Sequence, residues 1–250
     1  MNDLALELHE IGLRIGGAKI LEEVSFGVAE GEMVGVIGPN GAGKTTLFNV
    51  ISGLMQPTGG SLTMSGDDIT RASVHGRARA GIGRTFQTSS VFPDLSALEN
   101  VRIPAQIKLG GATSPWLFPR KHDRATAEAR ERLEEVGLDA HFETNAGVLS
   151  HGDKRKLEIA MLLATEPSVV LLDEPMAGVG SGDVPGLVEI IRTLHRSGRT
   201  VLMVEHHMEV LLGLVDRVAV MHHGKLLAIG TPDEITADPR VQEAYLGAAV

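Results

Sequence analysis

The chain has 250 residues, of which 43% are hydrophobic and 22% charged, as is ordinary for a water-soluble globular protein. This length allows one large domain or a core with an inserted subdomain. A formal charge of −9 argues against a large nucleic-acid-binding face and against direct binding to anionic lipids. Because the chain has no cysteine, disulfides, thiolate metal sites and cysteine nucleophiles are excluded.

Residues 1–20 include acidic side chains and lack a continuous apolar stretch, so they do not resemble a signal peptide. A membrane-spanning helix needs about 20 mostly apolar residues in a row, and the apolar runs here are much shorter. The protein is therefore expected in the cytoplasm, and a role at a membrane would come through a partner.

The first part of the chain predicts strands followed by a loop and a helix. Hydrophobic residues alternate over residues 24–28, which suits half-buried antiparallel strands. Residues 33–37 are a continuous apolar run that leads into a glycine-rich turn, and residues 44–54 predict a helix that ends before the breaker at 56–60. A strand, a glycine loop and a helix in this order are the context that a phosphate-binding loop requires.

The middle of the chain predicts a mostly helical insertion, from about residue 88 to residue 150. Residues 123–136 are charged, rich in alanine and amphipathic, and Gly137 would end that helix. Four prolines punctuate the segment: Pro93, Pro104, Pro115 and Pro119.

The last part of the chain returns to alternating strands and helices. Residues 169–172 and 200–204 are apolar throughout, as expected for parallel strands that are covered on both faces. Helices are predicted at 183–195 and 208–214. Two further strands, 217–221 and 225–229, flank His222, His223 and Gly224, which predict an ordinary hairpin turn.

Residues 38–45 match the pattern G-x-x-x-x-G-K-[ST]. The glycines let backbone N–H groups approach phosphates, and the helix that begins near Lys44 adds the positive end of its dipole. Lys44 would reach the β- and γ-phosphates, and the hydroxyl of Thr45 would bind Mg²⁺. A glycine turn with a surface lysine is the alternative. The nucleotide-binding residues predicted here are Gly38, Pro39, Asn40, Gly41, Ala42, Gly43, Lys44, Thr45 and Thr46.

The predicted strand at 169–172 ends in Asp173 and Glu174. In phosphate-loop enzymes an aspartate at this place holds Mg²⁺ directly or through water, and the adjacent Glu174 would orient or deprotonate the attacking water. Pro175 then gives the chain a rigid exit. A strand that simply ends in solvated acids is the alternative.

Two further segments lie between these sites, Arg84-Thr85-Phe86-Gln87 and Leu149-Ser150-His151-Gly152-Asp153. With the loop and the acidic strand they resemble the ABC ATPase family over essentially the whole chain. The resemblance implies an α/β fold with a RecA-like mixed-sheet core, an N-terminal antiparallel β subdomain and a helical subdomain insertion. Residues 1–87 and 165–250 would form the core, and residues 88–164 the helical subdomain with the signature helix.

The resemblance also implies the roles of individual residues in the hydrolysis of Mg·ATP. Ser150 and Gly152 stand in the family signature and would bind the γ-phosphate of ATP held by another protomer. Gln87 resembles the glutamine that senses Mg²⁺ and the attacking water, and His206, rather than its neighbour His207, resembles the switch histidine at the γ-phosphate. The implied catalytic residues are Glu174, His206 and Gln87, and the implied Mg²⁺ ligands are Thr45, Gln87 and Asp173.

Several positions depart from the family pattern. His151 and Asp153 replace a glycine and a glutamine of the signature, and Gly180 stands where an aspartate usually follows the catalytic glutamate. Ile15 occupies the place of an aromatic residue that stacks on adenine in many members. Contact with the base through Ile15 is therefore expected to be weaker than contact with the phosphates. A binding subunit that barely hydrolyses ATP is an alternative that these departures leave open.

Finer features resemble the branched-chain (hydrophobic) amino-acid importer group, namely residues 81–87, 157–160, 230–235 and 243–247. They imply a separate ATPase subunit that binds transmembrane permease subunits and a second ATPase subunit, identical or different. Such a subunit lies peripherally on the cytoplasmic face of the inner membrane. Val91 and Phe92 would line the groove for the permease, or else pack within the insertion. Importers of urea or short amides, lipopolysaccharide export and a soluble ABC ATPase outside transport remain alternatives.

Overall fold

The computed structural model describes residues 4–85, 91–110 and 124–246, and the chain divides into two compact units. The first unit comprises Met1–Arg84, Ser168–Glu174 and Arg192–Val250, and the second comprises Thr85–Pro167 and Pro175–Ile191. The subdomain boundaries drawn from the sequence at residues 87 and 165 stay a prediction. The contacts within the chain also group Pro175–Ile191 with the second unit.

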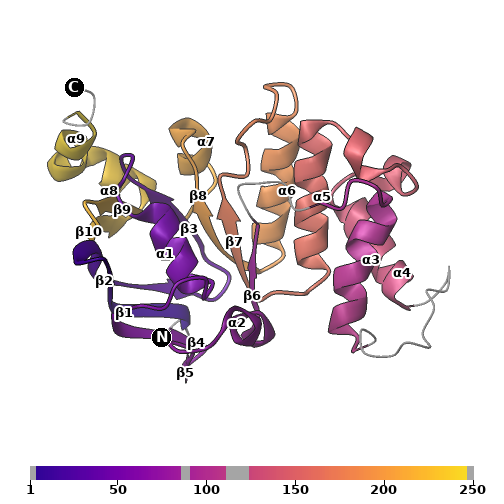
Figure 1. The fold of residues 1–250 in the computed structure, drawn as a ribbon. Helices are drawn as coiled ribbons and strands as arrows, with labels where there is room; N and C mark the ends of the chain where they lie inside the picture. Colours follow the sequence, from indigo (N-terminus) through magenta and orange to yellow (C-terminus); the bar gives the residue numbers. More distant parts are fainter. Residues whose placement is uncertain (1–3, 86–90, 111–123, 247–250) are drawn as a thin grey trace. The chain divides into compact units, whose positions relative to one another are not determined.

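One sheet of the first unit is antiparallel, with the order β2-β1-β4-β5 among the described residues (Figure 1). Burial alternates along its strands, so that β2 buries Val24, Phe26 and Val28 on one face. The antiparallel strands expected around residues 24–28 are therefore confirmed. The strands are β1 (Leu4–Ile15), β2 (Ala18–Ala29), β4 (Gly59–Met64) and β5 (Asp67–Asp68).

The other sheet of the first unit is mixed, with the order β10-β9-β3-β8-β7-β6 in the described part of the chain. Its strands run parallel except for the antiparallel β9–β10 hairpin. Every residue of β3, β7 and β8 is buried, which explains why these strands are apolar except for Asp173 at the end of β7 and Thr200 at the start of β8. The strands are β3 (Met33–Ile37), β6 (Ile82–Arg84), β7 (Val169–Asp173), β8 (Thr200–Val204), β9 (Arg217–His222) and β10 (Lys225–Gly230).

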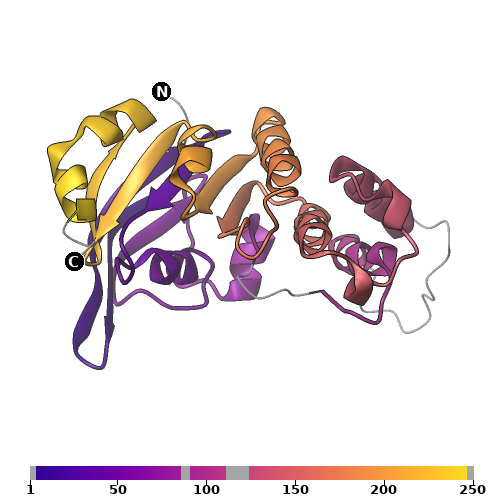
Figure 2. The same cartoon turned by 90° about the horizontal axis from the view of Figure 1, so that it is seen from above.

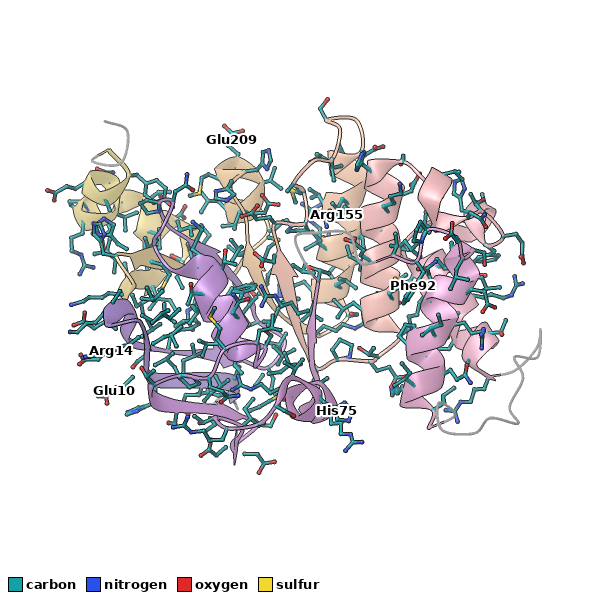
Figure 3. The ribbon with its side chains drawn as sticks, viewed as in Figure 1. Glu10, Arg14, His75, Phe92, Arg155 and Glu209 are labelled. Carbon is teal, nitrogen blue, oxygen red and sulfur yellow. The ribbon has the colours of Figure 1, made fainter. Side chains whose placement is uncertain are left out.

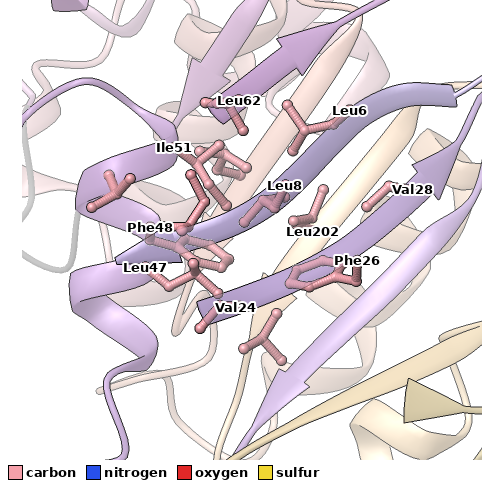
Figure 4. Close-up of a cluster of buried hydrophobic side chains, with 14 of the residues drawn as sticks. Leu6, Leu8, Val24, Phe26, Val28, Leu47, Phe48, Ile51, Leu62 and Leu202 are labelled. Carbon is pink, nitrogen blue, oxygen red and sulfur yellow. The ribbon is translucent and has the colours of Figure 1, made fainter. Parts of the chain in front are cut away.

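Helix α1 (Lys44–Ile51) follows the glycine turn after β3 and packs into the core between strands of both sheets. Figure 4 shows Leu47, Phe48 and Ile51 of this helix beside Leu8 of β1 and Leu202 of β8. All five side chains are at most 2% exposed. The helix that begins at the phosphate loop is therefore fixed by apolar packing along most of its length.

The C-terminal end of α1 is held by Arg77, a fully buried residue of α2 (Val74–Ala80). Its Nη1 donates to the carbonyls of Val50 and Ile51, the latter at 2.8 Å, its Nη2 to that of Thr70 at 2.8 Å and its Nε to that of Ala72 at 3.3 Å. Burial lowers the pKa of Arg77. One guanidinium thus satisfies carbonyls that the end of a helix leaves without internal partners.

The remaining described helices of the first unit lie at its C-terminal end or connect strands. A capping box of Thr231 and Glu234 starts α8, which explains the sharp start of the helix after β10. Figure 2 shows the β1–β2 hairpin projecting from this unit at the lower left, drawn in indigo. The helices are α7 (Met208–Leu212), α8 (Pro232–Ala237) and α9 (Pro239–Leu246).

The second unit is helical in its described part, as the sequence predicts for residues 88–150. Its α4 buries Ala125, Ala129 and Leu133 at a spacing of one helical turn and ends before Gly137. Pro104, one of the four prolines of this segment, lies inside α3. The elements are α3 (Ala97–Lys108), α4 (Arg124–Glu135), η2 (Asp139–His141), η3 (Ala146–Val148) and α5 (His151–Leu163), and α6 (Val184–Arg196) begins in this unit.

A search of the described helices finds none that combines the length and the apolar character needed to cross a bilayer.

Candidate functional site

The loop between β3 and α1 wraps around the side chain of Lys44. The Lys44 ammonium donates to the carbonyl oxygens of Gly38 at 2.6 Å and Pro39 at 3.1 Å, and the residue is only 7% exposed. Burial lowers the pKa of Lys44, while the carboxylates of Glu174 and Asp173 partly oppose this effect. The loop therefore holds the Lys44 ammonium near its own backbone carbonyls, which phosphate oxygens can replace as hydrogen-bond acceptors.

A cavity of about 320 Å³ brings the loop together with the ends of two neighbouring strands. Glu174 follows β7 and His206 follows β8, and the two side chains join the loop in lining this cavity. Parallel strands present their carboxyl ends at one edge of a sheet, so their polar end residues meet. The other lining residues are Ile20, Asn40, Gly41, Ala42, Gly43, Lys44, Thr45 and Thr46.

The backbone of Glu174 adopts a conformation that few non-glycine residues use, with φ of 50°. Its N–H donates to the carbonyl oxygen of Val204 at 2.9 Å, and its Oε1 lies 2.9 Å from Nε2 of His206. The side chain of Glu174 is 15% exposed and that of His206 is 50% exposed. Such strain persists where the surroundings fix it and is concentrated at functional sites. The geometry therefore marks Glu174 as a positioned carboxylate.

The two histidines after β8 point to different partners. Glu205, which is 3% exposed, accepts from the backbone N–H of His206 at 2.9 Å and lies 3.2 Å from Nδ1 of His207. His206 contacts Glu174, whereas His207 contacts Glu205. The geometry agrees with the choice of His206 made from the sequence, and its catalytic role stays a prediction. The positioning of both histidines by Glu205 was not predicted.

The β9–β10 turn supports the phosphate loop from outside the motif. His223 and Gly224 have φ values of 47° and 77°, as in the hairpin turn expected there. The N–H of Gly224 donates to the carbonyl of Ala42 at 3.0 Å, and its carbonyl accepts from the N–H of Glu22 at 2.8 Å. Local sequence carries no signal for this contact because the turn and the loop are far apart in the chain.

Ile15 lies at the tip of the β1–β2 hairpin, pairs with Ala18 and is 51% exposed. Ile20, which is not among the residues predicted from the sequence, lines the phosphate cavity instead. The role of Ile15 at the adenine base stays a prediction.

The signature segment belongs to the second unit. The Ser150 hydroxyl accepts from the N–H of Asp153 at 3.0 Å and donates to its Oδ2 at 2.8 Å, so Ser150 caps the start of α5. Partial burial opposes ionisation of Asp153, but hydrogen bonds from Lys156 and Ser150 lower its pKa overall. Gly152 is buried, and a Cβ there would lie 2.7 Å from Oδ2 of Asp183, a contact the sequence did not predict.

Asp173 is almost completely buried, and its Oδ2 accepts from the guanidinium of Arg84 at 2.7 Å. The hydroxyl of Thr45 lies on the first turn of α1, and Thr45 is exposed. Gln87 and residues 88–90 fall outside the described residues. The predicted Mg²⁺ ligands are thus described for Thr45 and Asp173 alone.

Comparison with known proteins supports the resemblance to ABC ATPases over the whole chain. Residues 21–177 match the family model described as ABC transporter, and residues 225–250 match that of the branched-chain amino acid ATP-binding cassette transporter. The high-affinity branched-chain amino acid transport ATP-binding protein LivG of Salmonella typhimurium is 38% identical over 255 residues, with 100% of both chains covered.

Two further proteins resemble the chain closely. The lipopolysaccharide export system ATP-binding protein LptB of Acidithiobacillus ferridurans is 39% identical over 228 residues, covering 91% of this chain and 90% of LptB. The crystal structure of the ADP conformation of MJ1267, an ATP-binding cassette of an ABC transporter, matches with a TM-score of 0.87 and 31% identity, covering 98% and 99% of the two chains. The predicted fold class is thereby confirmed. The chain belongs to the ATP-binding ATPase subunits of ABC transporters, in the branched-chain amino acid transporter family.

Proposed function

We propose that this ATPase subunit energises an importer of branched-chain or other hydrophobic amino acids, and that Glu174 is its catalytic carboxylate. The observation that carries the catalytic assignment is the 2.9 Å contact between Glu174 Oε1 and His206 Nε2 in the cavity that also contains Lys44. A carboxylate held by a hydrogen bond beside a phosphate-binding cation can orient a water molecule for attack on the γ-phosphorus.

In the proposed reaction, water forms a bond to the γ-phosphorus while the bond from that phosphorus to the β–γ bridging oxygen breaks. Glu174 accepts a hydrogen bond or the proton from the water, and His206 keeps Glu174 in position. Lys44 exchanges its contacts with the Gly38 and Pro39 carbonyls for oxygens of the β- and γ-phosphates. Most of the rate enhancement then comes from positioning and charge stabilisation.

The oxygen donors around the phosphate loop fit a Mg²⁺ ion. Mg²⁺ prefers oxygen ligands and binds in such sites to one or two protein oxygens together with substrate phosphates. The Thr45 hydroxyl and the Asp173 carboxylate are oxygen donors of this kind, and Gln87 would add an amide oxygen. When bound, the ion would neutralise charge on the phosphates during transfer.

The proposed active form is a pair of ATPase subunits that sandwich two ATP molecules. Each site would use the loop, Glu174 and His206 of one subunit with Ser150 and Gly152 of the other. This proposal is supported by the position of Ser150, which is exposed and caps the N-terminus of α5. There its hydroxyl and the positive end of the helix dipole can both contact a phosphate. The pair would contain either two copies of this chain or this chain and a related subunit.

Phe92 is the proposed contact to the permease, which would hold the subunit at the cytoplasmic face of the inner membrane. The residue is 49% exposed, and its backbone N–H and carbonyl both bond to the side chain of Asn100, at 2.7 and 3.1 Å. Figure 3 labels its side chain. Asn100 itself is fully buried. An exposed aromatic ring on a fixed backbone is well suited to fill a pocket on a partner.

The match of residues 225–250 to the branched-chain amino acid transporter model supports amino acids as the transported substrate. The 39% identity to LptB supports lipopolysaccharide export as the second candidate. Uptake of radiolabelled leucine and of urea in a strain that lacks this chain separates the importers. Loss of leucine uptake alone is expected. Normal leucine uptake together with impaired lipopolysaccharide delivery would favour the second candidate.

Complementation of that strain tests the docking surface. The Phe92→Asp variant should hydrolyse ATP at the basal rate in solution but fail to restore uptake. Ile107→Asp, which changes another exposed apolar residue of the second unit, is the matched control and should restore it. Equal uptake with both variants would contradict docking at Phe92.

A further inference from the structure

The guanidinium of Arg84, the last residue of β6, binds side chains from two other elements. Its Nη2 donates to Asp173 Oδ2 at 2.7 Å, and its Nη1 donates to Asn49 Oδ1 at 2.8 Å and to Ser52 Oγ at 2.9 Å. The side chains of Arg84 and Asp173 are 6% and 3% exposed. A buried arginine fork of this kind fixes the plane of a carboxylate as well as its position.

The partners of Arg84 connect the end of β7 with the end of α1. Asn49 lies in α1 and Ser52 is its C-terminal cap, whereas the first turn of the same helix contains Lys44 and Thr45. The guanidinium also lies 5.8 Å from the ring centroid of Phe48, in the range of a cation–π contact. A cation is favoured at this end of a helix by the helix dipole. Arg84 therefore ties Asp173 to the helix that begins at the phosphate loop.

We propose that Arg84 is a positioning residue for the metal site. It holds the Asp173 carboxylate in a fixed orientation relative to α1, so that Asp173 and Thr45 present their oxygens to the same Mg²⁺. Without the fork, the buried carboxylate loses the contact that fixes its plane relative to α1, so the two oxygens form a less well prepared site. This proposal rests on the proposed function, because it takes Asp173 and Thr45 as the ligands.

Removal of a residue that orients a metal ligand typically lowers metal affinity by about 10- to 100-fold. Arg84→Met keeps the length of the side chain but removes its charge and its donors. We expect this variant to bind Mn²⁺ about 10-fold more weakly than the wild type in the presence of a non-hydrolysable ATP analogue. The concentration of free Mn²⁺ is read by electron paramagnetic resonance, which does not depend on turnover.

Two other variants separate metal positioning from a general structural role. Arg84→Lys keeps a cation for Asp173 but cannot reach all the partners, so we expect a loss of about 3-fold, between the wild type and Arg84→Met. Arg217→Met removes a different ion pair of the first unit, from Arg217 to Glu32 at 3.2 Å, and should leave Mn²⁺ affinity unchanged.

Binding of the analogue in the presence of EDTA completes the test. The proposal predicts metal-free affinity within about 2-fold of the wild type for Arg84→Met, alongside the loss for Mn²⁺. Unchanged Mn²⁺ affinity, or an equal loss with and without metal, would overturn it. If Arg84→Met does not fold, Arg84→Lys decides, and wild-type Mn²⁺ affinity in that variant overturns the proposal. A wild type without metal-dependent nucleotide binding would instead defeat the proposed function itself.

Discussion

Arg77 is the buried side chain whose removal should most clearly disturb the helix beneath the phosphate loop. It is fully buried and donates to four backbone carbonyls, two of them in the last turn of α1. Arg77→Met replaces it with a side chain of similar length that has no hydrogen-bond donor. The substitution removes a donor from all four carbonyls while it keeps most of the packing. The carbonyls of Val50 and Ala72 keep a second donor, from the N–H of Gly53 and the side chain of Gln56.

The expected loss of stability follows from these contacts. Each buried carbonyl that loses its partner costs about 1–3 kcal/mol. Methionine recovers several kcal/mol, because the guanidinium no longer has to be desolvated. Two carbonyls lose their donor and two keep a second one, so the net loss should be about 2 kcal/mol. For a protein of this size about 1 kcal/mol corresponds to roughly 3 °C, so the Tm should fall by about 6 °C.

Thermal unfolding followed by far-UV circular dichroism measures this change. Arg79→Met is the matched control, because Arg79 lies on the same helix and is exposed. We expect the control to change stability by less than about 0.5 kcal/mol, or roughly 2 °C. A Tm decrease in Arg77→Met that is no larger than that of Arg79→Met would refute the role assigned to these hydrogen bonds.

Three further predictions follow from single residues. Gly224→Ala places a Cβ 2.3 Å from the carbonyl oxygen of Ile20, so it should weaken ATP binding and lower the free energy of unfolding by about 2 kcal/mol. The control Gly66→Ala, at φ of 86° with nothing within 4 Å of the added Cβ, should lower it by about 1 kcal/mol, and equal losses would contradict the role of the close contact. Burial raises the pKa of Tyr245, the single tyrosine, to about 12, so the midpoint of the tyrosinate absorbance titration should be higher in the folded protein than the value of about 10 expected in denaturant. The stability contributed by the neutral hydroxyl should be lost as the pH rises from about 10 to about 12. A midpoint near 10 in the folded protein would contradict the burial of this side chain. Ile15→Phe should lower KM for ATP by about 5-fold through base stacking at unchanged kcat, and an unchanged KM would place the base elsewhere.

The elements that the sequence predicts best are those whose signal is local. β3 and β8 agree with the predicted strands at 33–37 and 200–204, because continuous apolar runs lie between polar or glycine residues. The hairpin turn before Lys225 is local too. By contrast, the helix predicted at 44–54 ends at Ile51, where carbonyls bind Arg77 from a distant part of the chain.

The candidate site divides in the same way. Lys44, Thr45 and Glu174 lie within short sequence motifs, so it could be predicted that they line one cavity of the first unit. The contact between Arg84 and Asp173 joins residues 89 positions apart, and no local pattern indicates it. The support of the loop by Gly224 is equally non-local. Sequence motifs thus predict the residues that line the cavity at the loop better than the residues that hold them in place.

The Ser150 segment shows a third limit. Ser150 is the N-terminal cap of α5, which begins at His151. Its hydroxyl is bonded to Asp153, one of the two residues that depart from the family signature. In the proposed pair of subunits, the exposed Ser150 would meet the phosphate of the ATP held by the other subunit.

The rate of ATP hydrolysis by Glu174→Gln, compared with the wild type at saturating Mg·ATP, tests the central claim most directly. Glutamine keeps the shape of the side chain and can still contact His206, but it cannot accept a proton. The account predicts a decrease in kcat of at least about 100-fold, since general-base catalysis typically contributes 10²- to 10⁴-fold, with ATP binding retained. Equal rates for the two proteins would contradict the assignment of Glu174 as the catalytic carboxylate.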